Sequence, residues 1–260
     1  MSQQPQHYHV VALPMCHDNY GWLIHNSESA WILDPGDADV VIAALKRLNL
    51  KLKKIIITHR HWDHVDGIEA LHRFSQAPVY GPKDTHPHIT HFINEGDNLD
   101  LDGITLDVWH TPGHTQEHLS YYQAQQQWLF CGDTLFSAGC GRILKTGNLE
   151  QLYRSLERIR QLPPTTTIYC SHEYTLNNLA FAAIVEPSNH AITQKIEVVK
   201  KLRASNAPSL PTQLDSELTI NPFLRLQQTE IKKHCQAHSG QNKSDPFIIF
   251  CILREWKNSF

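Results

Sequence analysis

The segment Thr58-His59-Arg60-His61-Trp62-Asp63-His64 places three imidazoles and a carboxylate within six residues, directly after the strand-like run 54–57. Imidazole and carboxylate are the ligands that divalent zinc, iron and manganese accept. Side chains alternate sides in an extended segment, so His59 and His61 can face one ion. The adjacent Asp63 and His64 can serve a second ion if the chain turns into a helix there. The spacing therefore favours two metal ions over a loop of solvated histidines.

Residues of the same chemical types follow three later strand-like runs. They are His114 after the run 104–109, Asp133 after 128–131 and His172 after 167–170. Loops at strand ends usually carry the chemistry of sheet proteins. Taken singly, each residue has a structural explanation: a turn residue after Pro-Gly for His114, a turn carboxylate for Asp133 and a helix cap for His172. Their joint recurrence after strands favours a shared site.

The order of the predicted elements divides the chain near residue 174. Before this point, short runs rich in Val, Ile, Trp and Tyr alternate with turns and amphipathic helices. The predicted strands are 7–13, 20–25, 30–33, 55–57, 104–109, 128–131 and 167–170, and the predicted helices are 40–48, 65–74 and 149–162. After it we expect helices 176–185, 190–205, 229–238 and 246–256, with an extended, proline-marked linker at 206–222. We therefore expect domains at 1–173 and 174–260.

Charge and composition exclude several partners. A net charge of −3 provides no global basic field to gather nucleic acid or to coat an anionic membrane. Residues 1–7 lack the basic and apolar regions of an export signal, and the apolar run 247–253 is too short to cross a bilayer. The six scattered cysteines include no C-x-x-C pair and are expected to be reduced thiols. We expect a cytoplasmic protein with no nucleic-acid or membrane partner.

Four motifs occur in a recognisable order: Thr-His-x-His-x-Asp-His at 58–64, Thr-Pro-Gly-His-Thr at 111–115, Gly-Asp-Thr-Leu-Phe at 132–136 and Ser-His-Glu-Tyr at 171–174. Together they resemble the metallo-β-lactamase superfamily. Three further motifs, at 19–20, 138–141 and 221–225, narrow the resemblance to the glyoxalase II (hydroxyacylglutathione hydrolase) family. The resemblance covers essentially the whole chain. It implies an α+β fold, a metallo-β-lactamase-like αββα sandwich followed by a small all-α C-terminal domain that binds glutathione.

The resemblance also implies ligands for two divalent metal ions. Zinc is expected first, and iron and manganese also suit the donors. His59, His61 and His114 would hold one ion, Asp63, His64 and His172 the other, and Asp133 would bridge them. A catalytic zinc takes about three protein ligands and keeps an open position. Seven ligand residues therefore match two ions that share a carboxylate.

The implied reaction is hydrolysis of S-D-lactoylglutathione, or another S-(2-hydroxyacyl)glutathione, to glutathione and D-lactate, the second step of methylglyoxal detoxification. The resemblance implies attack by a hydroxide shared between the metals. The thiol leaving group has a pKa of about 8.5, so it needs little help from a protein acid. Asp63, as a proton acceptor, and Asp133, as the bridge, are the expected catalytic residues. The alternatives are a phosphodiesterase, a lactonase or a β-lactamase of the superfamily, and a non-catalytic metalloprotein or glutathione-binding module.

Glutathione carries two carboxylates, so its site should supply donors. Arg254 and Lys257 lie three residues apart on the last predicted helix and match the basic pair that the family uses for the glycine carboxylate. By the same resemblance, Tyr174 would bond the glutathione backbone and Arg142 would also reach glutathione. The positions that depart from the family pattern, with effects left open, are Asp66, Leu144 and Lys145. A monomer is expected.

Other conspicuous residues are expected to have structural roles. Asp34 is a turn carboxylate that can orient a ligand imidazole. His110 and His118 flank His114 and are expected to support the ligands or the strands. The histidines that we expect to form a solvated cluster are His86, His88 and His91.

Overall fold

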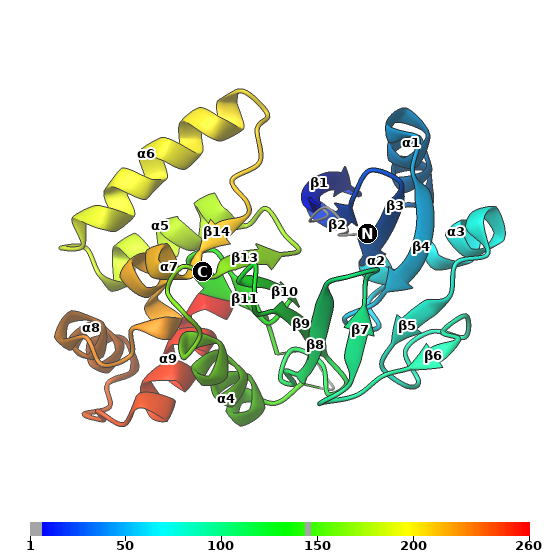
Figure 1. The fold of residues 1–260 in the computed structure, drawn as a ribbon. Helices are drawn as coiled ribbons and strands as arrows, with labels where there is room; N and C mark the ends of the chain where they lie inside the picture. Colours follow the sequence, from blue (N-terminus) through cyan, green and yellow to red (C-terminus); the bar gives the residue numbers. More distant parts are fainter. Residues whose placement is uncertain (1–6, 144–146) are drawn as a thin grey trace. The chain divides into compact units, whose positions relative to one another are not determined.

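The computed structural model describes residues 7–143 and 147–260 of the chain (Figure 1). Leu144 and Lys145 lie outside the described residues. The chain divides into two compact units. Unit 1 runs as far as His110 and includes Glu117–Gly132, and unit 2 comprises Thr111–Gln116 and Asp133–Phe260. The domains expected from the sequence, 1–173 and 174–260, divide the chain differently, and that division stays a prediction.

Unit 1 contains a six-stranded sheet in the order β1-β2-β3-β4-β5-β6. Its strands are β1 (His9–Met15), β2 (Asn19–His25), β3 (Ser29–Leu33), β4 (Lys51–Ile56), β5 (Val79–Gly81) and β6 (His91–Phe92), and its helices are α1 (Ala38–Leu48), α2 (Trp62–Val65) and α3 (Ile68–Ser75). The first two pairings are antiparallel and the remaining three are parallel. Leu23, Ile32 and Ile55 of the sheet pack with Val41 of α1 and Leu71 of α3 in one core.

Unit 1 also contributes four strands of a second sheet, in the order β10-β9-β8-β7. The strands are β7 (Asn98–Asp100), β8 (Thr105–His110), β9 (Leu119–Gln123) and β10 (Trp128–Gly132), and all three pairings are antiparallel. The buried Tyr121 of β9 donates its hydroxyl hydrogen to the carbonyl of Ile57. The backbone N–H of Leu119 donates to the carbonyl of Thr58 at 2.9 Å. The second sheet therefore holds the end of β4, where the predicted ligands begin.

Unit 2 is mainly helical (Figure 1). Its strands are β11 (Leu135–Phe136) paired with β12 (Gly139–Cys140), and β13 (Thr167–Cys170) paired with β14 (Thr212–Gln213), all antiparallel. Its helices are α4 (Leu149–Arg160), α5 (Thr175–Val185), α6 (His190–Ala204), α7 (Leu214–Ile220), the 3-10 turn η1 (Pro222–Leu224), α8 (Thr229–Ser239) and α9 (Pro246–Ser259). Leu179, Ile192, Val199 and Ile220 contribute to one of its cores. In the described part of the chain, no helix is long and apolar enough to cross a membrane.

The predicted helix ends are largely confirmed by their caps. The side chain of Asp37 accepts from the first backbone N–H groups of α1, and Asp245 caps α9 immediately before Pro246. Gly240 ends α8 with a φ of +69°, a conformation that glycine adopts without steric cost. These ends were predictable because capping depends on residues close in sequence.

Two predicted elements are wrong. The helix expected at 65–74 is divided into α2 and α3, because Gly67 leaves the helix to donate its N–H to the carbonyl of Pro35 at 2.9 Å. A Cβ at Gly67 would lie 2.3 Å from that carbonyl oxygen, so glycine permits the close approach. The extended linker expected at 206–222 contains β14 and α7. Its prolines bound these elements, while Leu214, Glu217 and Ile220 form a buried helical face between them.

Candidate metal centre

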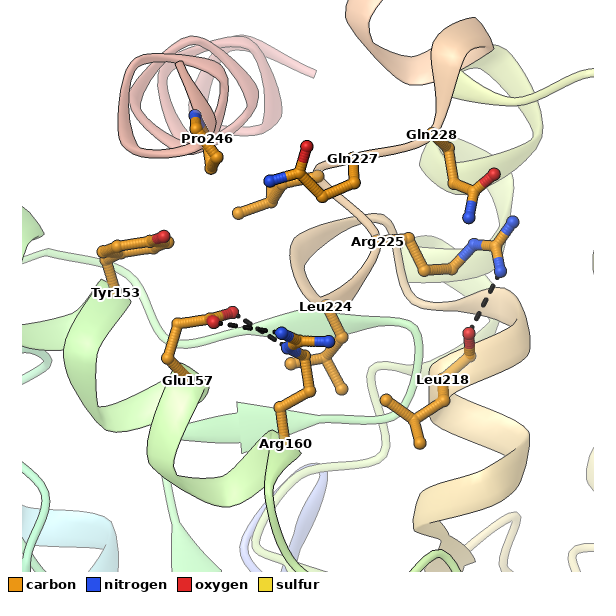
Figure 2. A pocket seen from close by; sticks show the side chains of 10 residues that line it. Tyr153, Glu157, Arg160, Leu218, Leu224, Arg225, Gln227, Gln228 and Pro246 are labelled. Atoms are coloured by element: carbon orange, nitrogen blue, oxygen red, sulfur yellow. Dashed lines mark hydrogen bonds and ion pairs between the residues drawn. The ribbon is translucent and has the colours of Figure 1, made fainter. Parts of the chain in front are cut away.

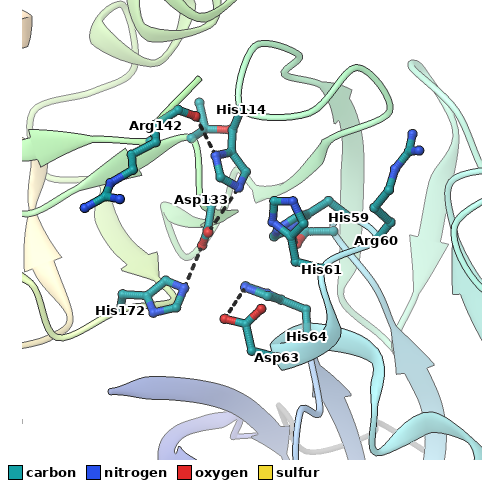
Figure 3. A network of polar contacts seen from close by, with 12 residues as sticks. His59, Arg60, His61, Asp63, His64, His114, Asp133, Arg142 and His172 are labelled. Atoms are coloured by element: carbon teal, nitrogen blue, oxygen red, sulfur yellow. Dashed lines mark hydrogen bonds and ion pairs between the residues drawn. The ribbon is translucent and has the colours of Figure 1, made fainter. Parts of the chain in front are cut away.

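Four predicted ligands lie on the segment that leaves β4 in unit 1. His59 and His64 are buried, and His61 and Asp63 are partly exposed (Figure 3). His61 precedes α2, whose four residues include Asp63 and His64. The chain therefore turns into a helix at this point, as the proposal of a second ion requires.

Two ring nitrogens on this segment can serve one cation. Nε2 of His59 lies 2.9 Å from Nδ1 of His61. On the other side of the His59 ring, Nδ1 lies 2.9 Å from the hydroxyl oxygen of Thr58, which donates its own hydrogen to Asp34. The Nδ1–H of His59 therefore donates to Thr58, and Nε2 keeps a lone pair. This is the arrangement of a metal-ligating histidine whose second nitrogen is held by the protein.

The buried carboxylate of Asp34 orients the second pair of ligands as well. It accepts from the backbone N–H of Thr58 at 2.8 Å, from the Thr58 hydroxyl at 2.7 Å and from Nδ1 of His64 at 3.0 Å. His64 consequently presents Nε2, which lies 3.7 Å from Oδ2 of Asp63. The prediction that Asp34 can orient the imidazole of a predicted ligand is confirmed. Its φ of +50° places it in the left-handed region that Asp tolerates better than most residues.

Sequence reasoning assigned no structural role to three residues that hold the ligand segment. Asn19 donates to Oδ2 of Asp63 at 2.8 Å. Arg60 donates to both carboxylate oxygens of Glu117, from Nε at 2.7 Å and from Nη2 at 2.6 Å. In the sequence, Asn19 stands out only as part of the family motif at 19–20. Pairs this far apart in sequence have no local signal that would identify them.

The supporting histidines occupy different environments. His118 is buried and stacks on His59 with 4.9 Å between the ring centroids, which confirms its expected supporting role. Gly132, at the end of β10, makes room for it: a Cβ there would lie 2.7 Å from Nε2 of His118. His110, by contrast, is exposed at the end of β8.

Unit 2 brings three predicted ligands together: His114, Asp133 and His172. Oδ2 of Asp133 lies 3.3 Å from Nε2 of His114, and Oδ1 lies 3.3 Å from Nε2 of His172 (Figure 3). All three side chains are buried. The two carboxylate oxygens thus face different imidazoles, as a carboxylate shared between two ions requires.

His114 is fixed from behind by backbone. Its Nδ1 lies 2.7 Å from the carbonyl oxygen of Arg142. Because a carbonyl can only accept, Nδ1 carries the hydrogen and Nε2 faces Asp133. Gly113 has a φ of +139°, and a Cβ there would lie 2.4 Å from the backbone of Leu152. Only glycine allows the chain to approach α4 this closely just before the ligand.

Tyr174, expected to contact glutathione, lies against the third ligand of unit 2. Its ring stacks on His172 with centroids 4.7 Å apart and planes 5° apart. Phe136 packs edge-on against both rings. Tyr174 is exposed, so an aromatic surface adjoins the predicted ligand His172.

The predicted cations of unit 2 have unequal environments. Arg254 is buried, and its Nη1 donates to the carbonyls of Cys140 at 2.9 Å and Gly141 at 3.3 Å. Lys257 is partly buried. Burial, followed by the positive charges of Arg254 and Arg142, lowers the pKa of Lys257 to about 8. Positive charge beside Lys257 therefore opposes protonation of its amine.

The predicted ligands sort into two candidate groups: His59, His61, His114 and Asp133 in one, and Asp63, His64 and His172 in the other. Each contains only imidazole nitrogens and carboxylate oxygens, which suit zinc, iron and manganese. Nδ1 of His59, His64 and His114 is bonded to protein oxygen. The residues therefore fit two divalent ions.

A separate cavity of about 280 Å³ lies in unit 2 beside α4 and η1 (Figure 2). Arg160 and Arg225 contribute its positive charges. Arg160 pairs with Glu157 at 3.1 Å, and Arg225 pairs with Glu186 at 2.6 Å. None of the predicted site residues lines this cavity. Its neutralised charges give no reason to place the substrate there.

Known sequences match both parts of the chain. The model of the family described as "Metallo-beta-lactamase superfamily" matches residues 18–172. The model of the family described as "Hydroxyacylglutathione hydrolase C-terminus" matches residues 173–260. The hydroxyacylglutathione hydrolase of Aeromonas hydrophila subsp. hydrophila is 46% identical over 256 residues, which cover 97% of this chain and 100% of that protein. The chain belongs to the hydroxyacylglutathione hydrolase family. Its activity is that of a hydroxyacylglutathione hydrolase, a metallohydrolase.

Other relatives agree with this assignment. The hydroxyacylglutathione hydrolase of Vibrio cholerae serotype O1 is 42% identical over 254 residues, covering 96% of this chain and 99% of that protein. The crystal structure of ETHE1 from Myxococcus xanthus has a TM-score of 0.66 and 24% identity, with 96% of this chain and 98% of that chain covered. That structure supports the fold alone. The predicted fold class, a metallo-β-lactamase fold with two sheets followed by a helical C-terminal domain, is confirmed.

Proposed function

We propose that this chain hydrolyses S-(2-hydroxyacyl)glutathione thioesters, with S-D-lactoylglutathione as the reference substrate, to glutathione and a 2-hydroxy acid. The observation that carries the proposal is the carboxylate of Asp133, whose oxygens lie 3.3 Å from Nε2 of His114 and of His172. The family supports the thioester substrate class. A place in methylglyoxal detoxification, a cytoplasmic location and a monomeric state stay predictions.

The proposed site uses two divalent metal ions, with zinc first and iron or manganese as alternatives. We assign His59, His61 and His114 to one ion, Asp63, His64 and His172 to the other, and Asp133 to both. When bound, such ions supply Lewis acidity and lower the pKa of water. This assignment is supported by the donor types and by the hydrogen bonds that orient the imidazoles.

The residues of the chain have distinct tasks in this proposal. Asp34 and Thr58 hold the imidazoles of His59 and His64 in the tautomer that presents Nε2. Asn19 orients Asp63, the proposed acceptor of a proton from the attacking water. The leaving thiol has a pKa of about 8.5, so its thiolate departs with little help from a protein acid.

The cations of unit 2 are proposed to hold the glutathione carboxylates. Lys257 and the exposed Arg142 offer charged donors, and Arg254 contributes its positive charge from a buried position. Tyr174 is proposed to bond the glutathione backbone beside His172. The lowered pKa of Lys257 supports an anionic ligand, because a carboxylate would offset the positive charges of Arg254 and Arg142 beside this amine.

The pKa of Lys257 predicts a pH dependence. The pKa is lowered, so the amine loses its charge as the pH rises through about 8, and carboxylate binding weakens. We expect kcat/KM for S-D-lactoylglutathione to decline over this range in the wild type. A Lys257→Arg variant, whose side chain stays charged, should not show this decline. The same decline in both proteins would exclude Lys257 as its origin.

The proposed function is tested by comparing substrates. Purified protein is assayed with S-D-lactoylglutathione, a phosphodiester and a lactone, and its metal content is measured on the same sample. We expect thioester hydrolysis to dominate in protein that carries two metal ions. Preferential hydrolysis of the phosphodiester or the lactone would instead favour another hydrolase of the superfamily.

A further inference from the structure

A buried carboxylate in α7 is bonded to the turn that follows Asp133. Oε1 of Glu217 accepts from the hydroxyls of Ser137 and Thr212, both at 2.8 Å. Oε2 accepts from the backbone N–H of Ala138 at 2.7 Å and from Nδ2 of Asn221 at 3.1 Å. Glu217 itself is fully buried. Burial raises the pKa of Glu217, and the four hydrogen bonds oppose this shift because they stabilise the ionised carboxylate.

Glu217 and Asn221 together define the path of the turn between β11 and β12. Nδ2 of Asn221 also donates to the carbonyls of Phe136 at 3.1 Å and Gly139 at 3.0 Å. Between these carbonyls, Ala138 has a φ of +55°. A non-glycine residue persists in this left-handed region where the surrounding contacts over-determine it. The bond from Ala138 N–H to Glu217 is such a contact.

The turn leads directly to the backbone that holds a proposed metal ligand. After Gly139 the chain passes through Cys140 and Gly141, whose carbonyls accept from Arg254. The next carbonyl, that of Arg142, accepts from Nδ1 of His114 at 2.7 Å. A displacement of the turn would therefore move the group that fixes the rotation of the His114 ring.

We propose that Glu217 is a positioning residue for the hydrolase. This role rests on the proposed function, because it concerns the metal centre that the proposed function assigns. Glu217 acts through the backbone 136–142: it holds the turn, and the turn places the carbonyl that directs Nε2 of His114. The helical part of unit 2 thus contributes to metal binding as well as to holding glutathione.

The test replaces Glu217 by Gln and measures metal affinity by competition with a chelator, using zinc alone as the probe. The amide nitrogen of Gln cannot accept, so the hydroxyls of Ser137 and Thr212, which now donate to Oε1, would have to reverse, and the charge that strengthens all four hydrogen bonds is lost. We expect zinc affinity to fall about 10- to 100-fold, the range typical for loss of groups that orient a metal-ligating histidine. kcat for S-D-lactoylglutathione should fall with it.

The matched control is Glu186→Gln. Glu186 is also buried in unit 2, and it accepts from Arg225 at 2.6 Å and 3.1 Å without contacting the 136–142 backbone. Both variants should lower Tm, whereas only Glu217→Gln should weaken zinc binding. If Glu217→Gln does not fold, Glu217→Asp, which keeps the charge but shortens the side chain, should show an intermediate loss of zinc affinity.

The outcomes separate the two proposals. The role of Glu217 alone would be overturned if its variants had the same zinc affinity and kcat as Glu186→Gln. In that case the wild type would still bind zinc and hydrolyse the thioester. A wild-type chain that binds no metal and leaves the thioester intact would overturn the proposed function, and the role of Glu217 with it.

Discussion

Replacing Asp133 by Ala should abolish thioester hydrolysis and lower the metal content of the purified protein. In unit 2 the two oxygens of this carboxylate face different imidazoles, those of His114 and His172. Its loss removes the one proposed ligand common to both ions. We expect kcat to fall by about 10³-fold or more, as is usual when one member of a cooperating catalytic set is removed. The measurements are the initial rate with S-D-lactoylglutathione and the metal-to-protein ratio.

A control variant distinguishes this effect from a general loss of a negative charge. Asp215→Ala removes an exposed carboxylate from α7 of the same unit. It should retain wild-type turnover and metal content. An Asp133→Ala protein as active and as metal-rich as Asp215→Ala would show that Asp133 is not a shared ligand.

Asp34→Ala should weaken metal binding without removing any proposed ligand. The substitution leaves three buried donors without their acceptor: the N–H and hydroxyl of Thr58 and Nδ1 of His64. His64 loses its orientation directly, and His59 loses it through Thr58. We expect metal affinity to fall about 10- to 100-fold and the free energy of unfolding to fall by about 3 kcal/mol. Chelator competition and urea denaturation measure the two effects.

Asp37→Ala is the matched control on the same loop. Asp37 caps α1 and bonds only to backbone N–H groups of that helix among the described contacts. Its loss should cost about 1 kcal/mol of stability, typical of an N-cap, and leave metal affinity unchanged. Equal metal affinities in the Asp34 and Asp37 variants would exclude the orienting role of Asp34.

The two candidate ligand groups were predictable because their residues have a strong local signal. His59, His61, Asp63 and His64 are close in sequence, and His114, Asp133 and His172 each follow an apolar run. Long elements such as α4 and α6 were predictable for the same reason, since hydrophobic periodicity and caps are local properties. The family resemblance then supplied the substrate class, which spacing alone does not indicate.

The supporting residues were not predictable in the same way. Asn19 and Glu117 act on residues more than forty positions away, and nothing in their neighbourhood marks them. The buried position of Arg254 was also unexpected, because a cation on a terminal helix is ordinarily solvated. The prolines around α7 led to the prediction of an extended linker in place of this helix. Its buried Glu217 accepts a hydrogen bond from Ala138, which is far away in the sequence. These features depend on tertiary contacts.

The bridging role of Asp133 is tested most directly by anomalous X-ray diffraction from crystals of the zinc-loaded protein. We expect two zinc peaks, one beside each oxygen of the Asp133 carboxylate, with His114 coordinating one ion and His172 the other. A single peak, or two peaks that Asp133 does not contact, would contradict the shared centre.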